Sequence, residues 1–219
     1  MRIAIDGPAG AGKSTVAKKI AERLGMAYVD TGAMYRAVAL AALREGISCD
    51  DAEGLARLAE KLEIGFGRGR GGETTIFLDG QEVSREIRTP AVSRFVSLVA
   101  RVPAVRRHLT EKQQQMAASG RVVMEGRDIG TVVLPDAEKK FFLTATVEER
   151  AKRRFLEAAN NGYGITLEDQ VKEIVNRDAC DAQREVAPLA PAPDAVIIDT
   201  TGKSPDEVVA VILALVQGG

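Results

Sequence analysis

Apolar residues along the chain form short continuous runs that alternate with segments of helical periodicity. The runs predict buried strands at the following positions: 3–5, 27–30, 121–125, 139–145 and 195–199. Apolar residues spaced three or four apart predict helices over 13–24, 33–44 and 51–62. Continuous apolar strands that alternate with helices are typical of a parallel sheet covered on both faces. The pattern therefore predicts an α/β fold.

One stretch, residues 63–84, departs from this alternation. Short β-like runs at 74–78 and 81–83 flank Asp79-Gly80, a dipeptide typical of tight hairpin turns. The stretch therefore predicts a small antiparallel insertion, followed by helices that begin near Pro90 and Pro103. We interpret the glycine- and arginine-rich residues 65–72 as an exposed hairpin loop rather than an RNA-binding segment, because they are few and do not repeat.

The later helices have clear start signals. Thr146 precedes Glu149 by three residues and Thr166 precedes Asp169 by three, a spacing that resembles the capping box. Ser204 is followed by a proline and then two acids, which is typical of a helix N-terminus. These signals predict helices that begin after residues 146, 166 and 204.

Composition restricts the function classes. The chain has 219 residues, 45% of them apolar, and a formal net charge of −1, so it lacks the basic surface that general nucleic-acid binding requires. The apolar run at 208–216 is too short to span a bilayer, and the two cysteines form no C-x-x-C pair. We expect a soluble cytoplasmic protein with no nucleic-acid or membrane partner, and a monomer by default.

The most specific motif is "GPAGAGKS" at 7–14, which fits the phosphate-binding loop G-x-x-x-x-G-K-[ST] between a strand and a helix. Glycines let successive backbone N–H groups point inward at an anion, and the helix N-terminus adds partial positive charge. Lys13 is expected to reach the β- and γ-phosphates, and the Ser14 hydroxyl to hold Mg²⁺. The residues expected to bind ATP or GTP are Gly7, Pro8, Ala9, Gly10, Ala11, Gly12, Lys13, Ser14 and Thr15.

The loop alone leaves the use of the nucleotide open between a small-molecule kinase, a GTPase and an ATPase. A GTPase should carry the base-reading motif N/T-K-x-D, which the sequence lacks. An ATPase should carry an acid after an apolar strand, and both Glu125 and Asp199 fit that weak pattern. A kinase must stabilise charge that spreads over the moving phosphoryl group, so it should place arginines at strand ends.

Arginines do gather at such places. Arg36 lies just inside a predicted helix, and Arg127 and Asp128 follow a predicted strand. Two further clusters have the spacing of one helix face: Arg150, Arg153 and Arg154, and then Arg177, Asp181 and Arg184. We expect most of them to face one anionic site. For the helix face formed by Arg177, Asp181 and Arg184, spacing alone favours neither an anionic site nor a solvent-exposed ladder of ion pairs.

Five motifs together resemble the bacterial type of cytidylate kinase. They are "IDGPAGAGKST", "DTGAMYR", "SREIRTPAVS", "EGRDIGTVV" and "REVAPL", and the resemblance covers residues 3 to about 200. It implies a P-loop nucleoside-monophosphate-kinase fold: a five-stranded parallel sheet flanked by helices, a small antiparallel insertion and a helical lid. It also implies transfer of the ATP γ-phosphoryl group to CMP or dCMP, with Mg²⁺, in pyrimidine nucleotide metabolism.

The resemblance also implies a division of the chain and a set of site residues. Residues 1–62 and 90–219 would form the kinase core, 63–89 the monophosphate-binding insertion, and about 148–166 the lid, with Gly162 and Gly164 as hinges. The residues implied to bind CMP are Thr31, Tyr35, Arg36, Ser97, Arg106, Arg127, Asp128, Arg177, Asp181 and Arg184. The residues implied to act in catalysis are Lys13, Arg127, Arg150, Arg153 and Arg154.

Two points of chemistry accompany these assignments. Cytosine presents two acceptors and an amine, which an arginine (Arg106) and the oxygens of Ser97 and Asp128 can match, whereas uracil would set a carbonyl against Asp128. For the metal, Glu125 stands where related kinases often carry Asp, so we assign it to the metal site beside Ser14, with Asp30 as the alternative.

Overall fold

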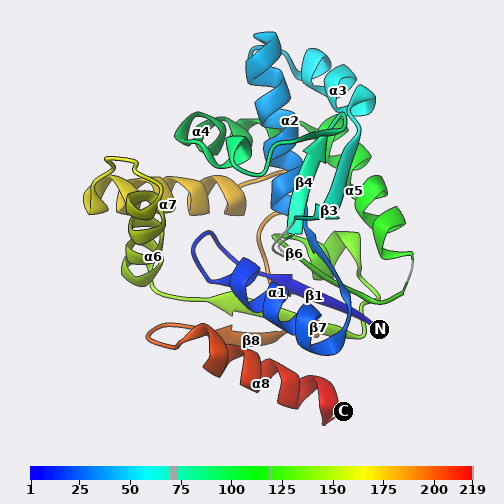
Figure 1. Cartoon of the computed structure of the whole chain (residues 1–219), viewed down its shortest axis with the longest axis vertical. Helices are drawn as coiled ribbons and strands as arrows, with labels where there is room; N and C mark the ends of the chain where they lie inside the picture. The colour runs from blue at the N-terminus through cyan, green and yellow to red at the C-terminus, as the bar shows by residue number, and fades with distance from the viewer. Residues whose placement is uncertain (70–73, 119, 219) are drawn as a thin grey trace. The chain divides into compact units, whose positions relative to one another are not determined.

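A computed structural model describes residues 1–69, 74–118 and 120–218 of the chain (Figure 1). Its internal contacts divide the chain into two compact units. The first consists of Met1–Tyr28 and Ser119–Gly219, and the second of Val29–Ala118. This division follows contacts within the chain. The core, insertion and lid expected from the sequence are instead defined by the substrate that each would bind, and they stay predictions.

A five-stranded sheet organises the first unit. Its strands are β1 (Arg2–Asp6), β2 (Ala27–Asp30), β6 (Val122–Gly126), β7 (Lys139–Thr144) and β8 (Val196–Asp199). They lie in the order β2-β6-β1-β7-β8, and β1 pairs in parallel with both β6 and β7, as β7 does with β8. The five-stranded parallel sheet is therefore confirmed, and β1, which leads into the phosphate loop, is its central strand.

The described part of the first unit also contains four helices. They are α1 (Lys13–Leu24), α6 (Val147–Asn160), α7 (Leu167–Ala182) and α8 (Pro205–Gln217), together with one π-helical turn, η2 (Ile129–Val133). Helices α1 and α8 pack against each other, and so do α6 and α7 (Figure 1). The core between α1, α8 and the sheet is fully apolar, with Ile3, Ile5, Ile20 and Val209 without solvent exposure. Burial of this apolar surface holds the loop-bearing strand in place.

The helix starts follow the expected capping chemistry. The hydroxyl groups of Thr146 and Thr166 accept hydrogen bonds from the backbone N–H groups of Glu149 and Asp169. At α8, Ser204 and Glu207 form a complete capping box. Each cap satisfies an N–H group that has no partner inside its helix. The three predicted starts are confirmed.

The second unit combines helices with a small antiparallel sheet. Its elements are α2 (Thr31–Glu45), α3 (Ala52–Lys61), β3 (Ile64–Arg68), β4 (Thr74–Leu78), β5 (Gln81–Glu82), the 3₁₀ turn η1 (Glu86–Arg88), α4 (Pro90–Val99) and α5 (Pro103–Ala117). The order β3-β4-β5 is antiparallel throughout. Asp79 and Gly80 both have positive φ, 49° and 78°, as the tight hairpin turn requires. The predicted small antiparallel sheet is confirmed. Residues 65–68 of the glycine- and arginine-rich stretch belong to β3 and not to a loop, and its residues 70–72 lie outside the described residues.

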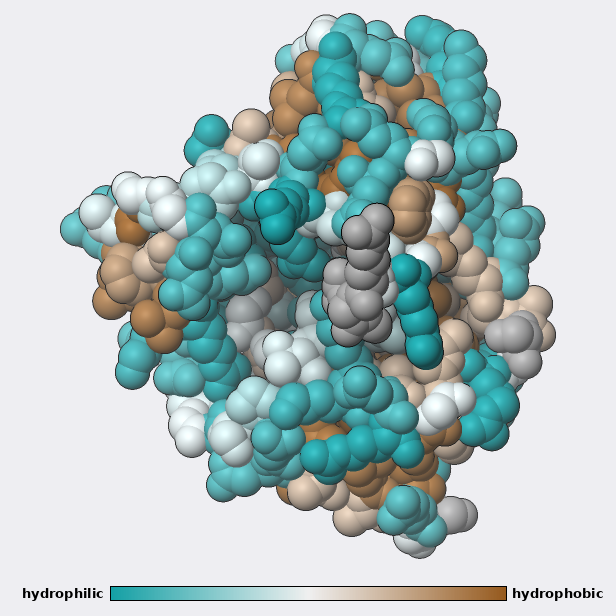
Figure 2. Space-filling model, in the orientation of Figure 1, coloured by the Kyte–Doolittle hydropathy of each residue, from teal (hydrophilic) through white to brown (hydrophobic). Residues whose placement is uncertain are grey.

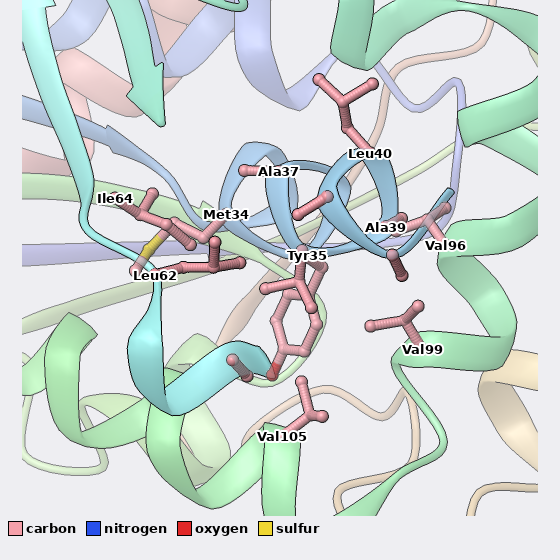
Figure 3. Packing of buried hydrophobic residues seen from close by; sticks show 14 of the residues in the cluster. Met34, Tyr35, Ala37, Ala39, Leu40, Leu62, Ile64, Val96, Val99 and Val105 are labelled. Carbon is pink, nitrogen blue, oxygen red and sulfur yellow. The ribbon is translucent and has the colours of Figure 1, made fainter. Parts of the chain in front are cut away.

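Helix α2 forms the centre of the second core. Ten of its residues are buried, including the whole run from Ala33 to Ala42 except Arg36. Figure 3 shows Met34, Tyr35 and Leu40 extending from α2 among side chains of the neighbouring elements. A helix that is apolar almost all round is one that is buried on nearly every face.

The surface agrees with a chain of ordinary polarity. The face drawn in Figure 2 is mostly hydrophilic, with apolar side chains in smaller patches. Across the described residues, no helix combines the length and apolar character needed to cross a bilayer.

Candidate active site

The phosphate loop connects the end of β1 to the start of α1. Gly7 has φ +144°, and a Cβ there would lie 2.0 Å from the carbonyl oxygen of Leu143. Gly10 has φ +77°, and a Cβ there would lie 2.8 Å from the carbonyl oxygen of Arg150. Both positions therefore require glycine, for backbone conformation and for space. The loop is held close to β7 and α6, with its N–H-rich turn at the N-terminus of α1.

Lys13 lies buried at the first position of α1, with its ammonium donating to the carbonyl oxygen of Pro8 at 2.9 Å. Burial and, after it, the charge of Arg127 lower its pKa to about 7, although Glu125 acts in the opposite direction. The lowered pKa shows that the ammonium group is removed from water beside a second cation. A phosphate group at this place would favour the charged form of Lys13.

Two arginines of α6 reach the same loop. Arg150 donates to the carbonyl oxygen of Ala9 at 3.2 Å, and Arg153 to that of Gly10 at 3.4 Å. Arg153 also binds the backbone carbonyl of Thr200 at 2.7 Å. The third arginine of the cluster, Arg154, lies 3.8 Å from a carboxylate oxygen of Glu157. The structure thus brings Arg150 and Arg153 to the phosphate loop and pairs Arg154 on the helix surface.

Sequence reasoning missed the residue that holds Arg150. Asp178 of α7 accepts two hydrogen bonds from the Arg150 guanidinium, at 3.0 and 2.6 Å. The Arg150 side chain is 5% exposed, so this bidentate pair is largely removed from water. Asp178 stands next to Arg177 in the sequence, but the partner lies on another helix, and local spacing carries no signal for that pairing.

Helix α7 carries a second charged cluster, centred on Asp181. Arg127 donates to one oxygen of this carboxylate at 2.8 Å, and Arg184 donates to the other. Asp181 is 1% exposed, so the alternative of a solvent-exposed ladder is wrong. Burial by itself raises the pKa of Asp181, but the charges of Arg127, Arg184 and Arg177 together lower it below its ordinary value. The carboxylate is therefore an anion held among three cations.

The ends of β1 and β6 and the residues just after β6 provide three acids. Glu125 is 3% exposed and accepts a hydrogen bond from the Tyr28 hydroxyl at 2.5 Å. Asp128 is buried directly before the π-helical turn η2. Asp6, which sequence reasoning also missed, accepts hydrogen bonds from the N–H groups of Ile129 and Gly130. Its position just before Gly7 was the available signal.

The donor set fits a magnesium ion that binds mostly through substrate. Ser14 offers a half-buried hydroxyl in the first turn of α1, and Glu125 a buried carboxylate at the end of β6. Within the described ranges, no group of three or more acid, histidine or cysteine side chains could enclose a metal. Mg²⁺ commonly uses one or two protein oxygens, phosphates and water, which this set can satisfy.

The second unit holds the other sequence-predicted residues. Arg36 of α2 donates to the Ile87 carbonyl at 3.2 Å and to the Ser93 hydroxyl at 2.9 Å. The buried Arg106 guanidinium lies 5.5 Å from the centre of the Tyr35 ring, a cation–π distance. The structure thus places Arg36 against the start of α4, and Tyr35 beside Arg106.

Three further residues complete that set. Thr31 is buried at the start of α2, and Ser97 is half-buried on α4. Asp30, the alternative metal residue, accepts from the backbone N–H of Ala33 at 2.9 Å and so caps α2. Its carboxylate also lies 3.7 Å from Arg88.

A phosphate loop at the end of the central strand of a parallel sheet, flanked by arginines, defines a P-loop kinase, an enzyme that transfers phosphoryl groups. The cytidylate kinase family profile matches residues 3–218. The chain belongs to this family, and the resemblance in the sequence is confirmed.

Individual relatives agree. The cytidylate kinase of Pelotomaculum thermopropionicum is 56% identical over 99% of this chain and 96% of its own length. That of Desulforamulus reducens is 55% identical over 99% and 97%. A crystal structure of an uncharacterized protein from Eubacterium ventriosum superposes with a TM-score of 0.54 at 13% identity, covering 100% of this chain and 99% of that one. This last likeness shows a shared fold.

Proposed function

We propose that this kinase transfers the γ-phosphoryl group of ATP to CMP and dCMP, giving CDP or dCDP and ADP. The observation that carries the proposal is the group of cations gathered at the phosphate loop, where Lys13 is buried and Arg150 and Arg153 bind carbonyl oxygens of the loop. Lys13 has a lowered pKa beside Arg127, and Arg127 in turn shares Asp181 with Arg184. Such a site favours two anionic substrates, and family membership indicates which two.

The loop would bind ATP through its backbone N–H groups, the N-terminus of α1 and Lys13. Ser14 and Glu125 would hold Mg²⁺, which supplies positive charge near the phosphates when it is bound. The CMP phosphate is already a nucleophile at neutral pH, so the chain needs no general base. Its residues act by aligning the two phosphates and by stabilising the charge that develops between them.

We assign the CMP phosphate to Arg36, Arg127 and Arg184, beside Thr31 and Tyr35, and the ribose to Arg177 and Asp181. Cytosine would be read by Ser97, Arg106 and Asp128. Uracil would set a carbonyl oxygen against the Asp128 carboxylate with no proton between them. A buried mismatch of this kind costs roughly 1–3 kcal/mol, which disfavours UMP.

We further propose that residues 148–166 act as a lid that closes over ATP and excludes water from the γ-phosphate. Arg150, Arg153 and Arg154 would then stabilise the transferred group, and residues 63–89 would bind CMP. Gly162 and Gly164 would serve as the hinges of the lid; Gly162 has φ +76°, the left-handed conformation common just after a helix ends. An Arg153→Ala variant should lower kcat, whereas unchanged kcat and KM for ATP would contradict the lid assignment.

A coupled assay with a panel of acceptors tests the whole proposal: ATP with CMP, dCMP, UMP, AMP or shikimate. We expect strong turnover with CMP and dCMP, weak turnover with UMP and little ATP loss without an acceptor. Turnover with another acceptor would indicate a kinase of different specificity, and hydrolysis independent of acceptor would indicate an ATPase. We also propose that the enzyme works as a cytoplasmic monomer, which light scattering at assay concentrations tests.

A further inference from the structure

The turn that carries Arg127 and Asp128 is held by a residue from another strand. Asp6, the last residue of β1, accepts from the N–H of Ile129 at 2.8 Å with one carboxylate oxygen. Its other oxygen accepts from the N–H of Gly130 at 2.7 Å. We call this pair of hydrogen bonds the Asp6 clamp. It uses both oxygens of a side chain that is 3% exposed.

The two N–H groups in the clamp are the first of the π-helical turn η2. The first N–H groups of a helical segment have no partner inside it and normally bind the side chain of the residue just before. That residue is Asp128, and its side chain makes no such cap bond. Its carbonyl oxygen instead accepts from Val132 and Val133 at 2.9 and 3.2 Å. Because Asp6 supplies the cap, capping does not require the Asp128 side chain.

We propose that Asp6 is a positioning residue that sets the place of Asp128, and thereby the discrimination between cytosine and uracil. This inference rests on the proposed function, in which Asp128 reads the amine of cytosine. Asp6 touches neither substrate in this account. It acts through the backbone of Ile129 and Gly130, which holds the turn that begins at Asp128.

The position of Asp6 suits this task. It pairs in register with Gly126 of β6, and the next residue in the chain, Gly7, opens the phosphate loop. One residue therefore joins the end of the ATP-binding strand to the turn that reads the acceptor base. The surroundings of Gly130 are also close-packed, since a Cβ there would lie 3.2 Å from Cδ of Lys140 and 3.4 Å from the Asp6 carboxylate.

The cost of ionising the buried Asp6 carboxylate supports the same role. Burial raises the pKa of Asp6 to about 6, the two backbone hydrogen bonds and Lys13 act in the opposite direction, and Asp128 adds repulsion. An ionised carboxylate at this position therefore costs the fold stability. A buried charge that is unfavourable for folding but completes two hydrogen bonds is best explained by what those bonds position.

The experiment compares Asp6→Asn with the wild type, using kcat/KM for CMP and for UMP with saturating ATP. Asparagine keeps the shape but turns an amide N–H₂ toward one of the two backbone N–H groups, so one clamp bond is lost. We expect the CMP-to-UMP ratio of kcat/KM to fall about tenfold, the effect of one buried hydrogen bond. KM for ATP should change less than twofold. A ratio equal to that of the wild type would overturn the inference.

Ile5→Val is the matched control, because it weakens the packing of the same strand without touching the clamp. It should lower the melting temperature and leave the CMP-to-UMP ratio unchanged. A similar fall in that ratio would show that the ratio depends on the packing of β1 and not on the Asp6 clamp. If Asp6→Asn does not fold, Asp6→Glu decides, since its extra methylene group displaces the carboxylate from the two N–H groups, and an unchanged ratio there overturns the inference. A wild type that fails to phosphorylate CMP refutes the proposed function instead.

Discussion

Two carboxylates in the first unit are almost equally buried and yet behave in opposite ways. Asp6, at the end of β1, is 3% exposed, and Asp181, on α7, is 1% exposed. Burial raises the pKa of Asp6 to about 6. Burial acts in the same direction on Asp181, but Arg127, Arg184 and Arg177 outweigh it, so the pKa of Asp181 lies below its ordinary value.

The difference lies in what surrounds each anion. Asp6 is bound by two backbone N–H groups, which are dipoles and compensate only part of the cost of removing a charge from water. Asp181 is bound by guanidinium groups, which carry full charge. The Asp6 region is thus suited to fix a turn, and the Asp181 region to hold several arginines together. Four measurements extend this comparison, from the largest expected effect to the smallest.

Asp181→Ala should have the largest effect on stability. The substitution leaves Arg127 and Arg184 without their shared anion, and an uncompensated buried charge typically costs about 3–5 kcal/mol. We expect a loss of that size in the free energy of unfolding, measured with urea at pH 7. Asp181→Asn, which keeps one acceptor, serves as the milder control, and a loss below about 1 kcal/mol for the alanine variant would contradict the assignment.

The pH dependence of stability should reveal the raised pKa of Asp6. Its pKa is about 6 in the folded protein against an ordinary value of 3.8, so between these values the folded protein retains a proton that the unfolded chain releases. The contribution of Asp6 therefore falls as pH rises from about 4 to about 6. The two-unit shift corresponds to about 3 kcal/mol.

Asp6→Asn removes that titration and provides the reference. The free energy of unfolding of the wild type should fall relative to that of the variant as the pH rises through this window. Urea denaturation at several pH values measures the difference, in which the titrating groups that do not interact with Asp6 cancel. A difference that stays constant from pH 4 to pH 7 would show that burial does not raise the pKa of Asp6.

Asp178→Asn tests a carboxylate of intermediate kind. Its side chain is 29% exposed and binds a guanidinium, that of Arg150, which is 5% exposed. Replacing a charge-assisted pair by a neutral amide should cost about 1–2 kcal/mol in stability. Since Arg150 also binds the Ala9 carbonyl, KM for ATP should rise. Thermal unfolding and ATP titration measure the two effects, and if both stay at wild-type values Asp178 does not hold Arg150.

Glu157→Gln tests an exposed carboxylate, for which we expect the smallest effect on stability. The Glu157 side chain is 52% exposed and lies 3.8 Å from Arg154, so solvent screens the pair. We expect a change in stability of at most about 0.5 kcal/mol, as for most surface ion pairs. Chemical denaturation at low salt gives the most sensitive measurement. A loss as large as that of Asp178→Asn would mean that solvent exposure does not determine how much each carboxylate contributes to stability.

Much of the fold could be predicted because its signals are local. Apolar runs predicted all five parallel strands, and Asp79-Gly80 marked a hairpin whose two turn residues adopt the positive φ that it requires. Capping residues marked the starts of α6, α7 and α8. The phosphate loop was readable for the same reason, because its backbone chemistry is specified by eight consecutive residues.

The site was predictable only in part. The sequence pointed to the arginines of α6 and α7, but spacing alone could not tell a solvent-exposed Asp181 from a buried one. It also held no sign that Asp178 would bind Arg150 or that Asp6 would cap η2. Those partners are 28 and more than 120 residues apart in the chain.

By itself, therefore, the sequence determined the α/β alternation, the insertion, the phosphate loop and the membership in a kinase family. Each of these depends on residues that are neighbours in the chain or on motifs of a few consecutive positions. Only the tertiary structure decided which acids carry an unfavourable charge and which are neutralised. The pKa of a buried carboxylate depends on the burial and on the charges brought within a few ångströms, and folding brings these from distant parts of the chain.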